Sequence, residues 1–279
     1  MKSSSRDLVQ LEGALWVLVA DTGMPIYDFA FARYFTARRD PFREAPVTAV
    51  ARVGAAEDYA SFFDEAAKDG ITLVHTPEQH QRCSTLPGWY PRIEDLTAKS
   101  EVFDHPPSAL EVESRFGWPV FLKGERQTAR HRRDLSIVRD RRAYEAAVAE
   151  WEREPILRWQ RIAVRELLAL RPVPAPESER ISPSFEFRVF LWRAEVVGFG
   201  RYWWEGPAYH CNASEEREAI ALARLAARRV DVPFLVVDVA QREDGRWVVI
   251  ECNDGQESGY AGVAPIAMWR RIIELESAR

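Results

Sequence analysis

The sequence predicts an α/β protein, and three features of the 279-residue chain support that fold class. A strand, a helix and a strand follow one another with short links near the N-terminus, which is typical of an α/β lobe. Two later segments, 185–199 and 234–259, each have the pattern of a strand hairpin. An amphipathic helix over residues 214–229 separates them. We therefore expect an N-terminal lobe over residues 1–95 and a second domain over residues 96–279.

The elements of the N-terminal lobe are predicted from its apolar runs. Ala14–Ala20 is continuously apolar, as expected for a buried strand of a parallel sheet. Val47–Val53 and Ile71–His75 are predicted as further strands, and Asp58–Lys68 between them has helical spacing. His75, at the end of the third strand, either contacts a substrate or, as we prefer, is hydrogen-bonded at the sheet edge.

The middle of the chain begins with a turn-rich stretch, Leu86–Pro91, which is a candidate linker. A short helix is expected at Ala109–Phe116, followed by an apolar strand, Pro119–Gly124, that ends with Lys123. That lysine either ends the strand at the surface or contacts a phosphate. The polar stretch Glu125–Arg139 is either a loop over a site or a plain surface loop; its candidate residues are Gln127, Arg130 and His131.

Residues 141–153 are expected to be helical, 156–170 mostly strand, and 171–184 a proline-rich loop. The hairpin that follows is predicted to turn near Arg193 and Ala194. Strand alternation then puts Glu186, Arg188 and Phe190 on one face.

An aromatic run and two helices are also predicted in the C-terminal half. The Tyr-Trp-Trp run at 202–204 is either core packing, which we slightly favour, or a flat wall of a binding site. Ser214 is predicted to cap the helix at 214–229. A closing helix is expected over 262–277.

The last hairpin carries two carboxylates and an amide on one face. With Asp244-Gly245 at the centre of a two-residue turn, Asp238 lies opposite Glu251, and Asn253 shares their face. Directly opposed carboxylates are about 5 Å apart at Cβ and repel each other, so a cation between them is expected. An all-oxygen ligand set favours Mg²⁺ or Mn²⁺. A solvated hairpin face is the alternative, and a longer loop would shift the register.

Composition narrows the class of protein. The net charge of −5 and the pI near 5.7 argue against a dedicated nucleic-acid or membrane-surface binder. Cys83, Cys211 and Cys252 are widely spaced and suggest neither a disulfide framework nor a zinc site. The chain has no apolar signal-like segment and no apolar run of membrane-spanning length. We expect a cytoplasmic protein.

The order of these elements resembles the ATP-grasp superfamily, and within it the R2K clade. The resemblance implies an α/β (α+β) fold: an N-terminal pre-ATP-grasp lobe followed by two α+β subdomains, about 96–165 and 166–279, that hold ATP between them. The stretch VVDVA…GRWVVIECNDGQESG carries most of it, because it matches the family's D…ExN pattern. The phosphate-covering loop departs from the family, since it is not glycine-rich.

The resemblance also implies roles for individual residues. Lys99 matches the first nucleotide lysine and Lys123 the second, which reaches the phosphates. Arg165, Glu166, Leu167 and Leu168 resemble the hinge that lines adenine. Glu186 and Arg188 fall on the phosphate-side strand, with Arg188 near the γ-phosphate. The remaining implied residues are the metal ligands Asp238, Glu251 and Asn253.

The implied activity is ATP- and Mg²⁺-dependent ligation of a carboxylate to an amine through an acyl phosphate, with Arg188 and Lys123 as catalytic residues. The substrates would be small molecules or peptides, contacted by Asp21, Thr22, Arg33 or Arg38. The loop at 256–259 is expected to direct backbone N–H groups at the acyl phosphate or the substrate carboxylate. A phosphotransferase and a non-catalytic nucleotide-binding module remain alternatives. A homodimer is possible.

Overall fold

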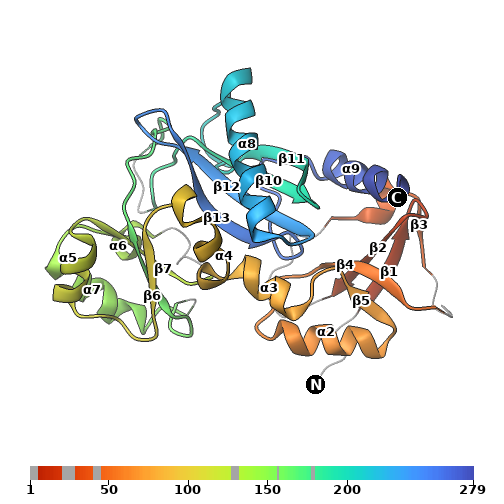
Figure 1. The fold of residues 1–279 in the computed structure, drawn as a ribbon, viewed down its shortest axis with the longest axis horizontal. Coiled ribbons are helices and arrows are strands. Elements are labelled where there is room, and N and C mark those ends of the chain that lie inside the picture. The colour runs from red at the N-terminus through yellow and green to blue at the C-terminus, as the bar shows by residue number, and fades with distance from the viewer. Residues whose placement is uncertain (1–5, 21–28, 40–44, 127–131, 156, 177–179) are drawn as a thin grey trace.

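The computed structural model describes residues 6–20, 29–39, 45–126, 132–155, 157–176 and 180–279. They form three sheets with helices packed against them (Figure 1). The five-stranded sheet comes from the N-terminal part of the chain, and the two four-stranded sheets come from the rest. The fold is the mixed α/β fold that the sequence predicts.

The N-terminal sheet has the order β3-β1-β2-β4-β5, with β2 parallel to β4 and β4 parallel to β5. Strand β1 was not predicted; it pairs antiparallel with β2 through a turn at Glu12 and Gly13, both with positive φ. Helix α2 packs beside β5, and Asp58 caps it by accepting a hydrogen bond from the backbone of Ser61. The elements here are β1 (Arg6–Leu11), β2 (Leu15–Ala20), α1 (Phe31–Tyr34), β3 (Ala37–Arg38), β4 (Val47–Arg52), α2 (Tyr59–Lys68) and β5 (Ile71–Leu73).

The predicted linker at 86–91 is wrong, because this stretch forms helix α4. Thr85 caps the helix by accepting a hydrogen bond from the backbone of Gly88, and Pro87 occupies its first turn, where a missing N–H costs nothing. Trp89 and Ile93 are buried against the C-terminal sheet and helix α8 (Ala213–Val230). Packing therefore overrides the turn propensity of the sequence. The connecting elements are α3 (Pro77–Ser84), α4 (Leu86–Ile93) and η1 (Glu94–Leu96).

The middle sheet has the order β6-β9-β7-β8, and all its strand pairs are antiparallel. Its last strand in the chain, β9, is shorter than the predicted 156–170, because residues 157–160 form a turn in which the Gln160 N–H bonds to the Leu157 carbonyl at 2.8 Å. The elements are β6 (Ser100–Phe103), α5 (Ala109–Phe116), β7 (Val120–Gly124), α6 (Arg133–Ser136), β8 (Ile137–Val138), α7 (Arg141–Trp151) and β9 (Ile162–Glu166).

The C-terminal sheet, β11-β10-β12-β13, is antiparallel and carries most of the predicted site. Helix α8 covers one face, and helix α9 with the N-terminal lobe covers the other (Figure 1). The cap of α8 is Asn212 rather than the predicted Ser214, since the Asn212 side chain accepts from the backbone N–H groups of Ser214 and Glu215. The elements are β10 (Glu186–Trp192), β11 (Glu195–Arg201), α8 (Ala213–Val230), β12 (Phe234–Gln241), β13 (Trp247–Asp254) and α9 (Pro265–Ser277).

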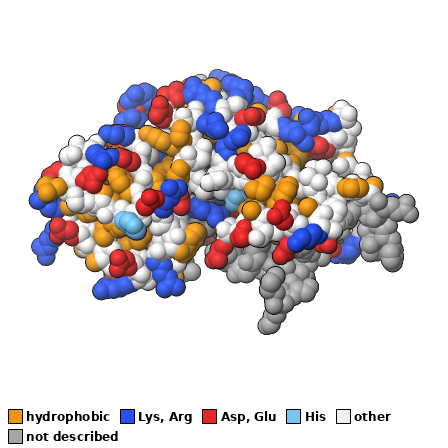
Figure 2. Space-filling view, turned by 60° about the horizontal axis from the view of Figure 1, so that its bottom comes forward, with side chains coloured by type: hydrophobic (Ala, Val, Ile, Leu, Met, Phe, Trp, Pro, Cys, Tyr) orange, Lys and Arg blue, Asp and Glu red, His pale blue; other side chains and the backbone are white. Residues whose placement is uncertain are grey.

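The molecular surface carries acidic and basic side chains interspersed on the face shown in Figure 2. Among the described residues, no helix has both the length and the apolar character needed to cross a membrane.

Candidate active site

A row of charged side chains crosses the C-terminal sheet on one face. Arg188 on β10 lies opposite Asp238 on β12, which lies opposite Glu251 on β13. Lys123, at the end of β7 in the middle sheet, reaches Glu251 from the other side and forms an ion pair with it. Two carboxylates therefore lie between two cations. We call these four residues the charged row.

The Lys123 end of the row is largely closed to solvent. The Lys123 side chain is 3% exposed, and that of Glu251 is 20% exposed. Burial opposes ionisation of Glu251, but the ammonium of Lys123 outweighs it and lowers the pKa of that carboxyl, with help from Arg165 and Arg188. Glu251 is therefore ionised, as a metal ligand must be.

The Arg188 end is held by a two-point ion pair. Its Nε and Nη2 donate to the two oxygens of Asp238 at 2.8 and 2.7 Å, and Nη1 donates to the Gly259 carbonyl at 2.8 Å. Burial works against the charge of Arg188, yet Asp238 raises the pKa of the guanidinium. The guanidinium is thereby fixed in position.

The third predicted metal ligand fits a cation site. Asn253 lies two residues beyond Glu251 on the same face of β13, and its Nδ2 is buried without a hydrogen-bond partner among the described residues. Nδ2 is a hydrogen-bond donor, so an unpartnered Nδ2 calls for an acceptor such as a phosphate oxygen, whereas a cation would bind the amide Oδ1. Two carboxylates and an amide oxygen together form a donor set that suits Mg²⁺ or Mn²⁺.

Glu186 lies two residues before Arg188 on the same face of β10, and it is 5% exposed. Its carboxyl accepts hydrogen bonds from the Ser184 hydroxyl at 3.1 Å and from the Trp203 indole N–H at 3.2 Å. Burial, with the nearby charge of Asp238, raises the pKa of Glu186 to about 8. Glu186 lines neither of the two cavities described below, and its predicted role in nucleotide binding remains a prediction.

A cavity of about 460 Å³ lies beside the predicted adenine hinge. Glu166, Leu167 and Leu168 line it together with Phe121 and Ile250. Leu168 lies beyond Glu166, the last residue of β9 that pairs with β7, and among the described residues no turn or loop hydrogen bond involves its backbone. Its peptide group is thus available to a flat, polar ring edge.

Two predicted nucleotide residues are bonded to the protein itself. Arg165 lines this cavity, but its guanidinium donates to Ser100 Oγ, Thr97 Oγ1 and the Ile250 carbonyl, each at 2.8 Å. It ties the middle sheet to β13. Lys99 does not line the cavity, and its ammonium donates to the Arg115 carbonyl at 2.6 Å. A nucleotide role for Lys99 requires that bond to open.

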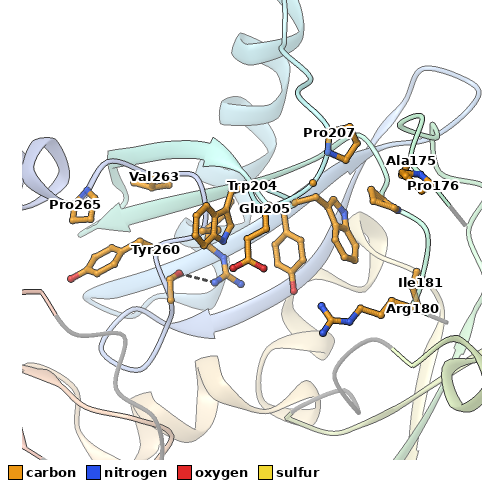
Figure 3. A pocket seen from close by; sticks show the side chains of 17 residues that line it. Ala175, Pro176, Arg180, Ile181, Trp204, Glu205, Pro207, Tyr260, Val263 and Pro265 are labelled. Carbon is orange, nitrogen blue, oxygen red and sulfur yellow. Dashed lines mark hydrogen bonds between the residues drawn. The ribbon is translucent and has the colours of Figure 1, made fainter. Parts of the chain in front are cut away.

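A second cavity, of about 910 Å³, lies at the Arg188 end of the row (Figure 3). Tyr202, Trp203 and Trp204 form part of its wall, and Trp204 is 52% exposed. The preference for core packing at 202–204 is therefore wrong for Trp204. The sequence does not distinguish the two roles, because an aromatic run is equally suited to both.

The two cavities share part of their lining, since Ile181 and Pro183 belong to both. The hinge lies in the smaller cavity, and Arg188 in the larger. Arg33 and Arg38 line neither cavity. The other candidate contacts, Asp21, Thr22, Gln127, Arg130 and His131, lie outside the described residues.

In the loop at 256–259, which was predicted to bind the acyl phosphate or substrate carboxylate, the backbone N–H groups of Gln256 and Glu257 are already bonded within the protein. The Gly255 N–H bonds to the Phe234 carbonyl, the Gln256 N–H to Asp254 Oδ1, and the Glu257 N–H to the Asp254 carbonyl. The Gln256 side chain is fully buried and accepts a hydrogen bond from the Ala51 N–H of the N-terminal lobe at 3.0 Å. These groups hold the lobes together, and only the Gly259 carbonyl reaches the charged row.

A buried cluster of His75, Cys83 and Asp254 has the spacing of a metal site but is satisfied by hydrogen bonds. The Phe234 N–H donates to His75 Nε2 at 2.9 Å, so Nδ1 carries the proton and donates to Asp254 Oδ2 at 2.9 Å. Burial raises the pKa of the Cys83 thiol, which disfavours the thiolate that a metal needs. The hydrogen-bonded role preferred for His75 is confirmed, although His75 lies two residues beyond β5 and its partners belong to β12 and β13 of the C-terminal sheet.

Comparison with protein-family models identifies the class of protein as ATP-grasp. The family model "ATP-grasp domain, R2K clade family 3" matches residues 86–272, and the chain belongs to that family. A search of curated proteins finds no significant match.

Solved structures share the fold at low sequence identity. A RimK domain ATP-grasp protein from Sphaerobacter thermophilus is 16% identical, with a TM-score of 0.54, covering 82% of this chain and 78% of the other. D-alanine–D-alanine ligase from Bacillus anthracis, complexed with ATP, is 10% identical, with a TM-score of 0.58 and coverage of 83% and 79%. The ATP-grasp ligase PsnB, complexed with minimal precursor, Mg and ADP, is 13% identical, with a TM-score of 0.53 and coverage of 92% and 86%.

Proposed function

We propose that this protein is an ATP- and Mg²⁺-dependent ligase that joins a carboxylate to an amine through an acyl phosphate and releases ADP and phosphate. The observation that carries the proposal is the charged row, because Arg188 at one end of it lines the larger cavity, and the predicted hinge lines the smaller cavity, which shares Ile181 and Pro183 with the larger one. Membership of an ATP-grasp family supports it. Ligases among proteins of the same fold, such as D-alanine–D-alanine ligase and PsnB, also support it.

In this proposal the smaller cavity holds the adenine. The backbone groups of Leu167 and Leu168, which line this cavity, pair with the ring edge, and Glu166 faces its amino group. The triphosphate then runs past Lys123 toward Arg188. Asp238, Glu251 and Asn253 would hold Mg²⁺, which supplies charge neutralisation at the phosphate oxygens when bound.

The chemistry has two steps, and this chain contributes mainly charge and position to both. A carboxylate oxygen of the substrate attacks the γ-phosphorus while the bond to the β–γ bridging oxygen breaks, giving an acyl phosphate and ADP. The amine then attacks the acyl carbon, loses a proton, and inorganic phosphate leaves. Arg188 and Lys123 stabilise the negative charge that accumulates on the transferring group.

The test compares two substitutions of the same type. Glu251→Gln removes a charge from the row, whereas Glu274→Gln changes an exposed residue of α9 whose side chain is 63% exposed. We expect Glu251→Gln to lower metal-dependent ADP formation, assayed with a pool of carboxylates and amines, roughly 100-fold, and Glu274→Gln to leave it unchanged.

Circular dichroism would check that both variants fold, because Lys123 loses its charge partner in the first. Undiminished turnover by folded Glu251→Gln, or turnover that a chelator does not affect, would refute the proposal.

A further inference from the structure

The larger cavity has features that point to a particular class of substrate. Its volume of about 910 Å³ is near the upper end of the range for sites that enclose drug-sized ligands. A ligand the size of alanine would leave most of it empty. The cavity therefore fits a molecule with a bulky side chain, or a short peptide.

The wall opposite the sheet is aromatic. Tyr202, Trp203 and Trp204 come from the segment between β11 and α8, and Tyr260 comes from the loop after β13. The segment is held in place by hydrogen bonds from the Trp204 N–H to the Tyr202 carbonyl at 3.0 Å and from the Gly206 N–H to the Trp203 carbonyl at 3.2 Å. An exposed indole on a fixed backbone offers a flat surface on which a planar group can stack.

The same cavity contains charges of both signs. Arg188 is fixed by Asp238 and the Gly259 carbonyl, and its guanidinium also lies 5.1 Å from the centre of the Tyr202 ring. Glu205 is exposed and points into the cavity beside Trp204 (Figure 3). Within the described part of the chain, Glu205 has no ion pair or hydrogen bond. A ligand that pairs with both Arg188 and Glu205 carries a carboxylate and a cationic group.

We propose that this cavity binds the carboxylate substrate as an amino acid or short peptide with an aromatic side chain. The carboxylate faces Arg188, the ammonium group faces Glu205, and the aromatic ring stacks on Trp204. The reaction of the bound carboxylate rests on the proposed ligase function, whereas its binding does not.

The test measures binding by titration calorimetry in the absence of nucleotide. The probes are phenylalanyl-phenylalanine, alanyl-alanine, and the N-acetyl and C-terminal amide forms of the aromatic dipeptide. We expect the free aromatic dipeptide to bind about tenfold more tightly than alanyl-alanine, and both blocked forms to bind more weakly than the free one.

Two tryptophan variants separate the cavity from general surface effects. Trp204→Ala should remove the tenfold preference for the aromatic dipeptide. Trp159→Ala, at an indole of similar exposure (48%) outside both cavities, should retain it. Glu205→Gln should bind the free and N-acetyl dipeptides equally, because it loses the partner of the ammonium group.

Equal affinity for the aromatic and aliphatic dipeptides, an equal effect of the two tryptophan variants, or no binding of any probe would overturn this inference. Its failure is distinguishable from failure of the ligase proposal. ADP formation that depends on Glu251 but shows no aromatic preference overturns this inference alone. Aromatic binding in the expected pattern without any ADP formation overturns the ligase proposal alone.

Discussion

Glu186 is enclosed by the protein within hydrogen-bonding distance of Ser184 and Trp203. Burial of this carboxyl favours its protonated form, whereas the two donated hydrogen bonds favour the carboxylate, and burial outweighs them. Burial, together with Asp238, raises the pKa of Glu186 to about 8 from an ordinary value of 4.5. Between these pH values the folded state binds more protons than the unfolded state, so the free energy of unfolding falls as pH rises and levels off above about 8.

Glu186→Gln should remove this pH dependence, because a neutral amide can accept the same two hydrogen bonds. We expect the variant to be more stable than the wild type at pH 8, by on the order of 2 kcal/mol, and close to it at pH 5. Urea unfolding of metal-free protein at both pH values measures the difference. Glu274→Gln controls for the loss of one charge at an exposed position. A variant less stable than the wild type at pH 8 would contradict the prediction.

The residues of the charged row could be predicted only in part. Strand alternation correctly puts Asp238, Glu251 and Asn253 on one face, and the predicted pairing of Asp238 with Glu251 is confirmed, although the turn differs from the prediction. That Lys123 and Arg188 would pair with these carboxylates does not follow from alternation, because the Lys123–Glu251 contact joins two different sheets. The wall at Tyr202–Trp204 was one of two predicted alternatives and not the preferred one, because hydrophobicity alone does not separate a buried ring from one that lines a cavity.

The β12–β13 hairpin reaches the predicted register by an unpredicted route. The turn has three residues, Glu243 to Gly245, with the Gly245 N–H bonded to the Arg242 carbonyl at 3.0 Å and only Gly245 at positive φ. Compared with the predicted two-residue turn, this loop shifts the pairing by one position, so Val239 faces Val249 instead of Ile250. A bulge at Ile250 shifts it back, and Asp238 again faces Glu251. The bulge also frees the Ile250 carbonyl for Arg165.

The end of this hairpin depends on a glycine for its packing. A Cβ at Gly255 would lie 2.5 Å from Cγ of the fully buried Phe234 ring, and the Gly255 N–H bonds to the Phe234 carbonyl. Gly255→Ala must therefore move a packed ring or the backbone of β13. We expect a loss of about 1–3 kcal/mol in the free energy of unfolding.

Thermal unfolding measures the effect, with Gly206→Ala as the matched control. At Gly206 the nearest atom to a new Cβ, the Trp203 carbonyl oxygen, is 3.5 Å away, which is an ordinary contact. The packing argument fails if both variants unfold at the same temperature.

At the scale of the whole molecule, the lobes are joined by contacts that a local pattern does not reveal. Gln256 bonds to Ala51, and Arg52 Nη1 donates to the Gly255, Gln256 and Ser258 carbonyls, across more than 200 residues of sequence. Arg126, which follows strand β7, connects the middle sheet to both lobes. It donates to the Ala56 carbonyl at 3.0 Å and to Glu257 at 3.3 Å. The α/β class was predictable from periodicity. The contacts between the lobes were not predictable, because each contacting segment alone has the sequence of an ordinary loop.

The arrangement of the two cavities also predicts which bond of ATP breaks. With adenine at the hinge, the terminal phosphate is the part of the nucleotide that extends toward Arg188 and the larger cavity. Both cations of the charged row, Lys123 and Arg188, then stabilise charge at that end. We therefore expect ADP and phosphate as products, rather than AMP and pyrophosphate.

The expected intermediate gives this prediction a chemical test. An acyl phosphate reacts with hydroxylamine to form a hydroxamate, so incubation with ATP, Mg²⁺, a carboxylate substrate and hydroxylamine should yield ADP and hydroxamate in equal amounts. Omitting the carboxylate should suppress both, because the γ-phosphoryl group then has no acceptor beside Arg188. AMP as the sole nucleotide product would refute the assignment of the terminal phosphate to the charged row. ADP with a stable phosphorylated alcohol and no hydroxamate would instead identify a phosphotransferase, since the same row stabilises the first transfer in either reaction and only an acyl phosphate is open to attack by an amine.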